Sequence, residues 1–174
     1  MSVIPRAPRR EGVCPSSSEV SYDPFVISLA AKEDHAALTA LLHAQLAEHE
    51  IHMSMDRLAA AIDGILTDAS RGVFLVARVD GEVVGVAYLS FIWSLEHGGR
   101  SAWLEELYVR PANRSAGLGR ALLLAACEHA RAEACAAVDL EVETTHARAA
   151  NLYIREGFHP QRRSRWVRML APRR

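Results

Sequence analysis

The chain has 174 residues, half of them hydrophobic, so it is long enough to bury one core without a metal or a disulfide. Its 20 basic and 21 acidic residues give a formal net charge of -1. This balance argues against nucleic acid or an anionic membrane as a partner, and any charged ligand must be met locally.

Residues 1–24 are rich in proline and serine and predict a flexible leader, with a single domain over residues 25–174. The leader's arginines are followed by no apolar segment typical of a secretion signal, and no apolar run is long enough to span a membrane. The 3 cysteines (Cys14, Cys127 and Cys135) lack CxxC spacing and predict free thiols. We therefore expect a cytoplasmic protein.

The first half of the domain predicts a strand, two helices and a hairpin. Residues 25–30 are β-rich, residues 32–50 place leucines at helical spacing behind Asp34 as a helix N-cap, and residues 55–69 predict a second helix. Residues 72–93 hold two β-rich runs separated by Asp80-Gly81, a strong hairpin signal. An antiparallel meander is the expected result.

The second half predicts a βαβ unit and a closing helix and strand. A strand over residues 101–109 is followed by a helix over 117–135 and a strand over 137–144, with a right-handed crossover. Residues 147–157 predict a helix with Gly157 as its C-cap, and residues 163–170 alternate well enough to be a last strand. The fold class is therefore α/β with a mixed sheet.

Residues 109–120, which we call the cradle, carry the most informative motif. Pro111 ends a strand, and R-S-A-G-L-G leads directly into an amphipathic helix. The unpaired N–H groups and dipole of a helix N-terminus attract an anion, while Gly117 and Gly119 lack the Cβ atoms that would keep a phosphate away. Arg114 and Arg120 add positive charge. An ordinary glycine-containing turn is the alternative.

Two other phosphate motifs fit this segment less well. It lacks the Gly-Lys-Ser/Thr ending of a P-loop, and Leu122 stands where a dinucleotide fingerprint has its third glycine. Glu141 lies about where a ribose-binding carboxylate would be, so an NAD-dependent oxidoreductase remains an alternative. Too few residues follow Glu141 to complete a doubly wound fold.

The hexapeptide R114-S-A-G117-L-G119 resembles the R-x-x-G-x-G/A signature of the GCN5-related N-acetyltransferases, and the flanking LEELYVRP and NLYIREGF resemble that family's neighbouring segments. The resemblance covers about residues 25–170 in element order, and is closest to the small-molecule and polyamine branch. It implies a mostly antiparallel sheet splayed between strands 4 and 5, about four flanking helices, and acetyl-CoA in the gap. His146 departs from the pattern, because the family usually has asparagine there.

The resemblance also assigns residues to the coenzyme and to the chemistry. The backbone of Leu107 and Val109 would bind pantetheine, and the cradle would bind the pyrophosphate. The full set of expected coenzyme contacts is Leu107, Tyr108, Val109, Arg114, Ser115, Ala116, Gly117, Leu118, Gly119, Arg120, Asn151, Tyr153 and Arg155.

Acetyl transfer from a thioester to an amine needs a base and an acid, because the amine must lose a proton and a thiolate must leave. Glu105 and Glu106 are adjacent on one strand and should point to opposite faces. The resemblance favours Glu105 as the base, acting directly or through water, with Glu106 as the alternative. Tyr153 is the expected acid, and a core aromatic is its structural alternative.

The acceptor is expected to be a small amine, a polyamine or a peptide amine, because acidic residues gather near the expected groove. They are Glu48, Glu50, Glu96, Glu105, Glu106, Glu141 and Glu143. Trp93 and His97 lie on the same expected side.

His49 and His52 with Glu48 and Glu50 form only a weak metal pattern, so we expect no metal. The tail strand could pair across a homodimer in folds of this kind. A catalytically silent module that binds acyl-CoA is a further alternative.

Overall fold

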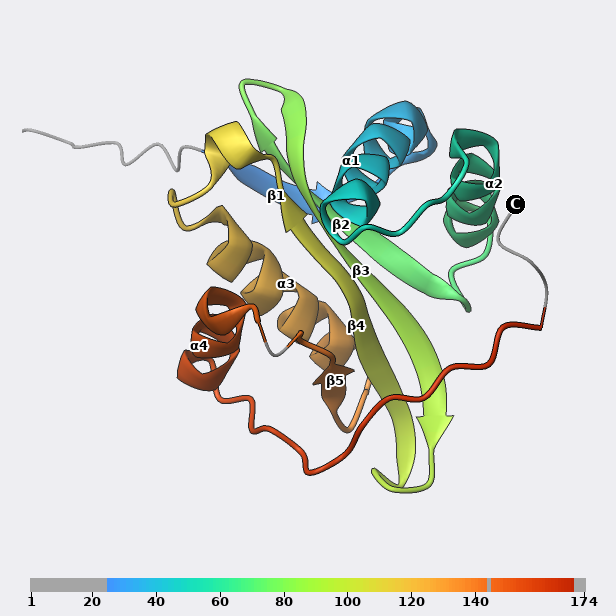
Figure 1. The fold of residues 1–174 in the computed structure, drawn as a ribbon, viewed down its shortest axis with the longest axis vertical. Coiled ribbons are helices and arrows are strands. Elements are labelled where there is room, and N and C mark those ends of the chain that lie inside the picture. The colour runs from blue at the N-terminus through green and yellow to red at the C-terminus, as the bar shows by residue number, and fades with distance from the viewer. Residues whose placement is uncertain (1–24, 144, 171–174) are drawn as a thin grey trace, which may run out of the picture.

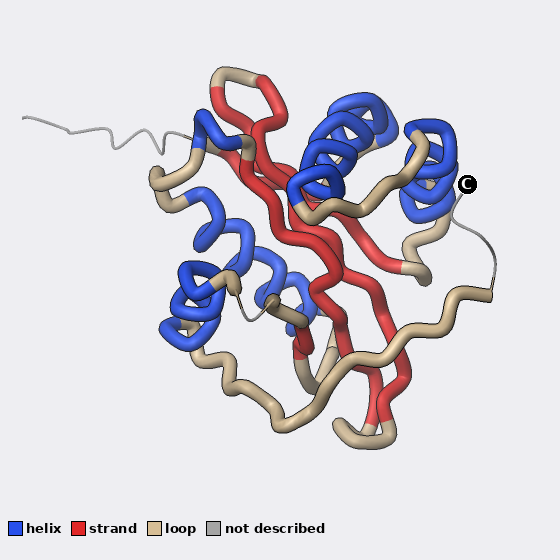
Figure 2. Tube along the Cα trace, viewed as in Figure 1, coloured by secondary structure: helices blue, strands red, loops and turns tan. Residues whose placement is uncertain are grey.

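A five-stranded sheet in the order β1-β2-β3-β4-β5 forms the centre of the molecule (Figure 1, Figure 2). The computed structural model describes residues 25–143 and 145–170, so the expected leader lies outside the described residues. Strands β1 to β4 are antiparallel neighbours, and β5 is parallel to β4. The strands are β1 (Val26–Leu29), β2 (Gly72–Val79), β3 (Glu82–Ser94), β4 (Gly99–Val109) and β5 (Val138–Leu140). The predicted mixed α/β fold is confirmed.

Helices cover both faces of this sheet. Helices α1 and α2 pack on one face, whereas α3 packs on the other with α4 beside it (Figure 1). The α helices are α1 (His35–Glu48), α2 (Met55–Leu66), α3 (Leu118–Ala132) and α4 (Ala147–Arg155), and the short 3-10 helices are η1 (Lys32–Asp34) and η2 (Pro111–Asn113).

Two hydrophobic clusters follow from the alternation of side chains along β3 and β4. On the α1 face, Leu38 and Ile62 are buried against Val86, and on the α3 face Leu122 is buried against Leu89. Because successive strand residues point to opposite faces, one strand serves both clusters. Both helix layers are thereby packed on β3, the neighbour of strand β4, which carries Glu105 and Glu106.

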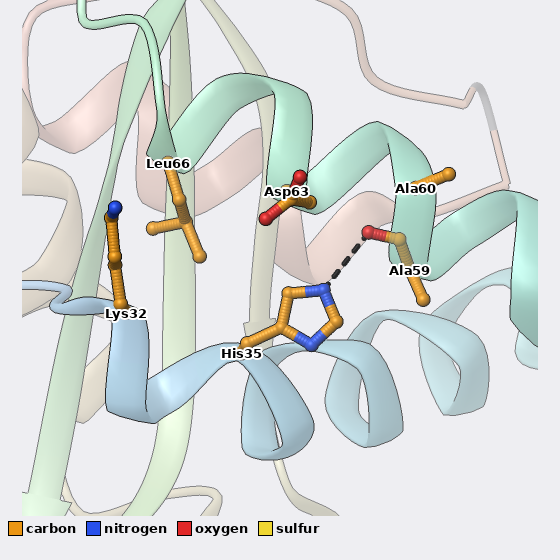
Figure 3. Close-up of a pocket in the computed structure, with 6 residues that line it drawn as sticks. All are labelled: Lys32, His35, Ala59, Ala60, Asp63 and Leu66. Atoms are coloured by element: carbon orange, nitrogen blue, oxygen red, sulfur yellow. Dashed lines mark hydrogen bonds between the residues drawn. The ribbon is translucent and has the colours of Figure 1, made fainter.

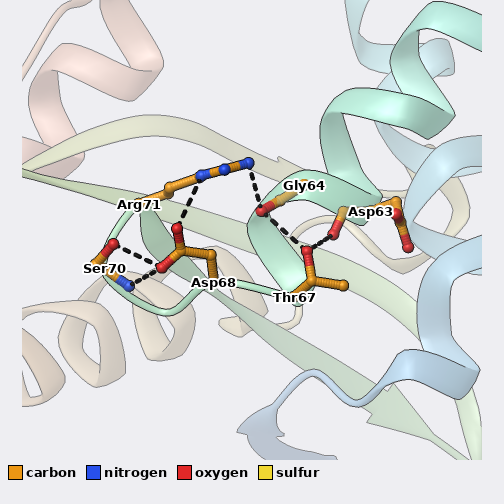
Figure 4. Close-up of polar contacts among 6 residues, drawn as sticks. All are labelled: Asp63, Gly64, Thr67, Asp68, Ser70 and Arg71. Carbon is orange, nitrogen blue, oxygen red and sulfur yellow. Dashed lines mark hydrogen bonds and ion pairs between the residues drawn. The ribbon is translucent and has the colours of Figure 1, made fainter.

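The turns that connect the elements use the residues their backbone needs. Asp80 and Gly81 have φ values of 49° and 82°. Positive φ at both central residues is what a type I′ turn requires, and the Asp-Gly pair predicts this turn between β2 and β3. The connection from α2 to β2 is fixed by Asp68, whose carboxylate accepts from Ser70 and pairs with Arg71, and Arg71 in turn donates to the Gly64 carbonyl (Figure 4). The entry to β2 is therefore held by side chains.

Three local predictions differ from the structure. Strand β5 has three residues, fewer than predicted. Asp34 occupies the N-cap position of α1 without a capping bond, because its carboxylate accepts from the Ala31 N–H and from Arg78. The predicted last strand over residues 163–170 is wrong: the segment is irregular and exposed.

Within the described residues, the tail contacts the rest of the chain through side-chain ion pairs and has no strand pairing. Arg163 binds Glu96 in the turn between β3 and β4, and Arg165 binds Glu141 just after β5. In the view of Figure 1, the tail runs from α4 below β5 and crosses in front of β4 and β3 toward α2. In the described part of the chain, no helix is long and apolar enough to cross a membrane.

Candidate functional site

The sheet opens between β4 and β5, where the predicted coenzyme gap lies. The two strands pair only from Ala102 to Leu104 on β4, against Val138 to Leu140 on β5. Beyond Leu104, β4 continues to Val109 and pairs with β3 on its other side. The strand therefore presents backbone N–H and C=O groups toward the opening, among them those of Leu107 and Val109, where an extended ligand arm can pair.

A β-bulge in β4 places Glu105 and Glu106 differently from the prediction. Leu104 pairs with Leu89 and Glu106 with Tyr88, so Glu105 is the extra residue without a partner. Glu105 accepts from Ser90, which lies two residues after Tyr88 on β3 and therefore on the same face, the α1 face. Glu106 accepts from Gln45 of α1. The prediction that the two carboxylates point to opposite faces is wrong, because the bulge resets the alternation.

The environments of these two carboxylates are different. Glu106 is half-buried and accepts from Gln45 Nε2 at 2.5 Å. Burial raises the pKa of Glu106 to about 7, although the nearby His49 opposes the shift. Glu105 is exposed and accepts from the Ser90 hydroxyl at 2.8 Å. Glu106 therefore changes charge near neutral pH, which is the property that a general base needs.

The cradle has the backbone that its sequence predicts. Helix η2 begins at Pro111, Ser115 and Gly117 have positive φ values of 73° and 83°, and α3 begins at Leu118. Residues 114–117 are exposed, and a Cβ added at Gly117 would meet no atom within 4 Å. The N-terminus of α3 therefore opens to solvent at the end of β4, where a phosphate can reach its N–H groups.

Both predicted phosphate-binding arginines contact carboxylates. Arg114 donates from Nε to the Val109 carbonyl at 2.8 Å and from Nη2 to both oxygens of Glu48, and it lies over the Tyr108 ring. Arg120 makes a fork-like pair with Glu156. A guanidinium that binds a carboxylate in this way has the geometry that also suits a phosphate.

Helix α4 carries the predicted acid and reaches back to the cradle. Tyr153 is half-buried beside Phe158, with ring centroids 5.8 Å apart, and burial raises the pKa of its phenol. The phenol is therefore protonated at neutral pH and can donate. Asn151 and Arg155 are exposed on the same helix.

Two residues of this region were missed by sequence reasoning. Gln45, buried on the apolar face of α1, contacts Glu106, and Arg148 donates to the Ser115 hydroxyl of the cradle at 3.1 Å. A polar residue among the leucines of the predicted helix was the signal for Gln45. No local sequence pattern indicates the contact of Arg148 with Ser115, because the two residues are 33 positions apart.

A separate cavity of about 430 Å³ lies between α1 and α2 (Figure 3). It is lined by Lys32, His35, Ala59, Ala60, Asp63 and Leu66. His35 donates from Nε2 to the Ala59 carbonyl across it at 2.9 Å, which ties the two helices together. None of the predicted site residues lines this cavity, so the opening beside β4 is the better candidate for the site.

Residues 36–158 match the Acetyltransferase (GNAT) family. The chain belongs to this family. The predicted family and fold are thereby confirmed, and the antiparallel order of β1 to β4 is not the doubly wound sheet of a dinucleotide-dependent oxidoreductase.

This GNAT chain is 37% identical over 109 residues to an aminoglycoside N(6′)-acetyltransferase type 1 of Stenotrophomonas maltophilia, which covers 60% of this chain and 70% of that protein. It is 32% identical over 96 residues to a streptothricin acetyltransferase of Streptomyces lavendulae, over 52% of this chain and 46% of that protein. The chain thus spans about half the length of the streptothricin enzyme.

Solved structures agree with the family assignment. A candidate acetyltransferase from Arthrobacter sp. FB24 is 30% identical, with a TM-score of 0.71 over 91% of this chain and 99% of that one. An aminoglycoside N-acetyltransferase solved with CoA is 19% identical, with a TM-score of 0.73 over 84% of this chain and 95% of that one, and shares the fold.

Proposed function

We propose that this GNAT protein transfers an acetyl group from acetyl-CoA to a primary amine of a small molecule, by direct attack in a ternary complex. One observation carries the proposal. The bulge in β4 places two carboxylates on one face of the sheet, at the point where β4 separates from β5 and directly before the cradle. A proton acceptor is thereby combined with an opening for a thioester and a site for its phosphates.

The chain's own groups suit the two ends of acetyl-CoA, which would supply the activated acetyl group. Leu107 and Val109 lie beyond the last β4–β5 pair, so the backbone of Leu107 and the N–H of Val109, whose carbonyl accepts from Arg114, offer pairing to the pantetheine amides. The open N-terminus of α3 offers N–H groups to the pyrophosphate. Arg114 and Arg120 would exchange their carboxylate partners for phosphate, because both side chains lie at the solvent edge.

Glu106 is the base that the geometry supports best. An alkylamine with a pKa of about 10 must lose a proton before it attacks, and a carboxylate whose pKa is raised is a stronger acceptor than an ordinary one. Glu105, which the family resemblance favours, stays a prediction; its carboxylate lies on the same face and could position the amine or a relaying water. Two carboxylates beside one opening would also attract a cationic amine.

Tyr153 is proposed as the acid that protonates the departing thiolate. Its half-buried phenol keeps its proton at neutral pH. It belongs to α4, whose first turn is bonded to the cradle through Arg148 and Ser115. This contact would help to fix the position of the Tyr153 phenol relative to the phosphate site in the cradle.

A small polar amine is the acceptor that the relatives and the charges support. The matched relatives include enzymes named for aminoglycosides, streptothricin and glucosamine 6-phosphate. Of the seven acidic residues predicted near the acceptor, four are in described ion pairs with Arg or His: Glu48, Glu96, Glu141 and Glu143. Of the other three, Glu50 lies after α1, whereas Glu105 and Glu106 lie on β4 beside the opening and are the carboxylates best placed to meet an acceptor cation.

The test is a thiol-release assay with acetyl-CoA over aminoglycosides, amino sugars, polyamines and peptides. We expect turnover with at least one small amine, and we expect Tyr153→Phe to lower kcat about 100-fold or more while the Kd for acetyl-CoA stays within about twofold. Phe158→Leu is the packing control and should keep most of the turnover, because it loosens the ring pair but keeps the phenol.

A thermal-shift series with acetyl-CoA, CoA and NAD separates the other functions, since a ligand that binds the native state raises its stability. Stabilisation by CoA with no thiol release for any amine would indicate a silent acyl-CoA-binding module. Stabilisation by NAD alone would refute the proposal. Unchanged turnover of Tyr153→Phe would remove this residue from the mechanism and leave the acetyl transfer itself standing.

A further inference from the structure

Three potential metal ligands from two segments that are distant in the sequence meet at one place beside the candidate site. His49 caps the C-terminal end of α1, Glu143 follows β5, and His146 caps the N-terminal end of α4. Their ligand atoms all lie within 4.8 Å of one another. We propose that His49, Glu143 and His146 form a binding site for a divalent transition-metal ion, with Zn²⁺ as its best occupant.

The distances suit one ion held by three ligands. Glu143 Oε1 lies 3.0 Å from His49 Nδ1, and its Oε2 lies 3.8 Å from His146 Nε2. The two imidazole rings are 5.2 Å apart at an interplanar angle of 70°. Ligands bonded to Zn²⁺ at about 2.0–2.2 Å in a tetrahedron are separated by about 3.3–3.5 Å, so small side-chain rotations close the site.

The ligand types favour Zn²⁺ over the alkaline-earth ions. Two imidazole nitrogens suit Zn²⁺, which also accepts a carboxylate oxygen, whereas Mg²⁺ and Ca²⁺ prefer oxygen ligands alone. A site with three protein ligands leaves a fourth position for water or a ligand group. The side chains of His49, Glu143 and His146 are 27%, 57% and 49% exposed, so an ion can enter from solvent.

The site is distinct from the metal pattern visible in the sequence. His49 and His52 have HxxH spacing, but His52 is not a member of the cluster. The two partners of His49 come instead from the connection between β5 and α4, and Glu143 is 94 residues away in the sequence. The ion would therefore join the segment after α1 to the segment before α4, across the end of the opening between β4 and β5.

This inference does not depend on the proposed acetyl transfer and can be tested without it. Isothermal titration calorimetry with ZnSO₄ on the full chain, without a polyhistidine tag, should give one site per chain with a micromolar or tighter Kd. His49→Ala, His146→Ala and Glu143→Gln should each weaken the Kd at least tenfold and remove the increase in Tm that Zn²⁺ causes. His52→Ala is the matched control from the same loop and should bind like the wild type.

Co²⁺ reports on the ligands by spectroscopy. We expect visible d–d bands typical of nitrogen and oxygen ligands, and their loss in His49→Ala. A Co²⁺ spectrum with strong thiolate charge-transfer bands would place the ion on a cysteine and overturn the proposal. Zn²⁺ binding that His52→Ala abolishes, or that all three ligand variants retain unchanged, would overturn it as well. Each variant's far-UV circular dichroism, matched to the wild type, would show that the loss of binding is local.

Discussion

At the scale of single residues, Glu106 links the structure to a measurable pH dependence. Burial raises its pKa to about 7, so its base form is lost as the pH falls through 7. We expect kcat/KM to fall about tenfold for each pH unit below that value. Glu106→Gln should lower turnover about 100-fold or more and abolish this acidic limb, whereas Glu105→Gln, the matched neighbour, should keep it. A limb that disappears in Glu105→Gln instead would identify Glu105 as the base.

The raised pKa of Glu106 also predicts the direction in which the free energy of unfolding changes with pH. Between the ordinary glutamate pKa of 4.5 and about 7, the folded chain keeps the Glu106 proton and the unfolded chain has lost it. The free energy of unfolding contributed by this group therefore decreases as the pH rises through that window. Glu106→Gln, which cannot ionise, should raise the Tm at pH 8 relative to the wild type and change it little at pH 4.5. Thermal melts of both proteins at the two pH values would check the sign.

Residue-scale features could be predicted only where they depend on local sequence. The resemblance to the acetyltransferase family singled out Glu105, Glu106 and Tyr153. The positive φ at Gly117 follows from its place before a helix. The bulge at Glu105 and the pairing of Gln45 with Glu106 could not be predicted, because a register shift depends on the neighbouring strand and the Gln45 contact joins residues 61 apart.

At the scale of elements, the packing at the first residue of β2 can be tested with one substitution. Gly72 has a φ of 148°, and a Cβ at this position would lie 2.1 Å from the Leu89 carbonyl oxygen. Gly72→Ala must therefore push β2 away from β3 and should lower the free energy of unfolding by about 2–4 kcal/mol. Gly99→Ala is the control, because its Cβ would meet nothing within 4 Å, and it should change stability by less than about 0.5 kcal/mol.

Chemical denaturation of both glycine variants gives the comparison. Equal stabilities of Gly72→Ala and Gly99→Ala would contradict the close approach of β2 and β3 at this point. The m-value should stay near that of the wild type in both variants, since neither change alters the surface exposed on unfolding.

Elements with strong periodicity were predicted well, and those that depend on a partner were not. Helix α3 places its apolar residues on one buried face, and the Asp80-Gly81 turn fixes the hairpin of β2 and β3. Strand β5 was predicted too long, because its sequence favours extended backbone but only three residues find partners on β4. An apolar alternation does not create a neighbouring strand, which is why the tail over residues 163–170 was predicted wrongly.

At the scale of the whole molecule, the strand order could be predicted because each connection limits the next. Two hairpins make β2, β3 and β4 antiparallel neighbours, and a crossover helix makes β5 parallel to β4. The meeting of the segments after α1 and after β5 could not be predicted in this way, since it depends on how both faces of the sheet are covered. The proposed metal site lies at this meeting point.

The exposed apolar tail bears on the expected homodimer, which stays a prediction. Trp166 and Leu170 are each 91% exposed in a segment held to its own chain by the ion pairs of Arg163 and Arg165. Exposed ion pairs contribute little, and an apolar stretch open to water is typical of a surface that another chain covers. β5 has β4 as its one neighbour among the described strands, so its other edge can accept a partner's tail.

We therefore expect size-exclusion chromatography with light scattering to give a dimer, and Trp166→Ser with Leu170→Ser to give a monomer of unchanged far-UV circular dichroism. Ile154→Ser is the matched control, since this side chain is 57% exposed on α4 and lies outside the tail, and it should stay dimeric. Trp166 fluorescence should shift to longer wavelength on dilution as the dimer separates and the indole enters water. A wild type that is monomeric at every soluble concentration would refute the homodimer, and a dimer that survives the double substitution would place its interface elsewhere.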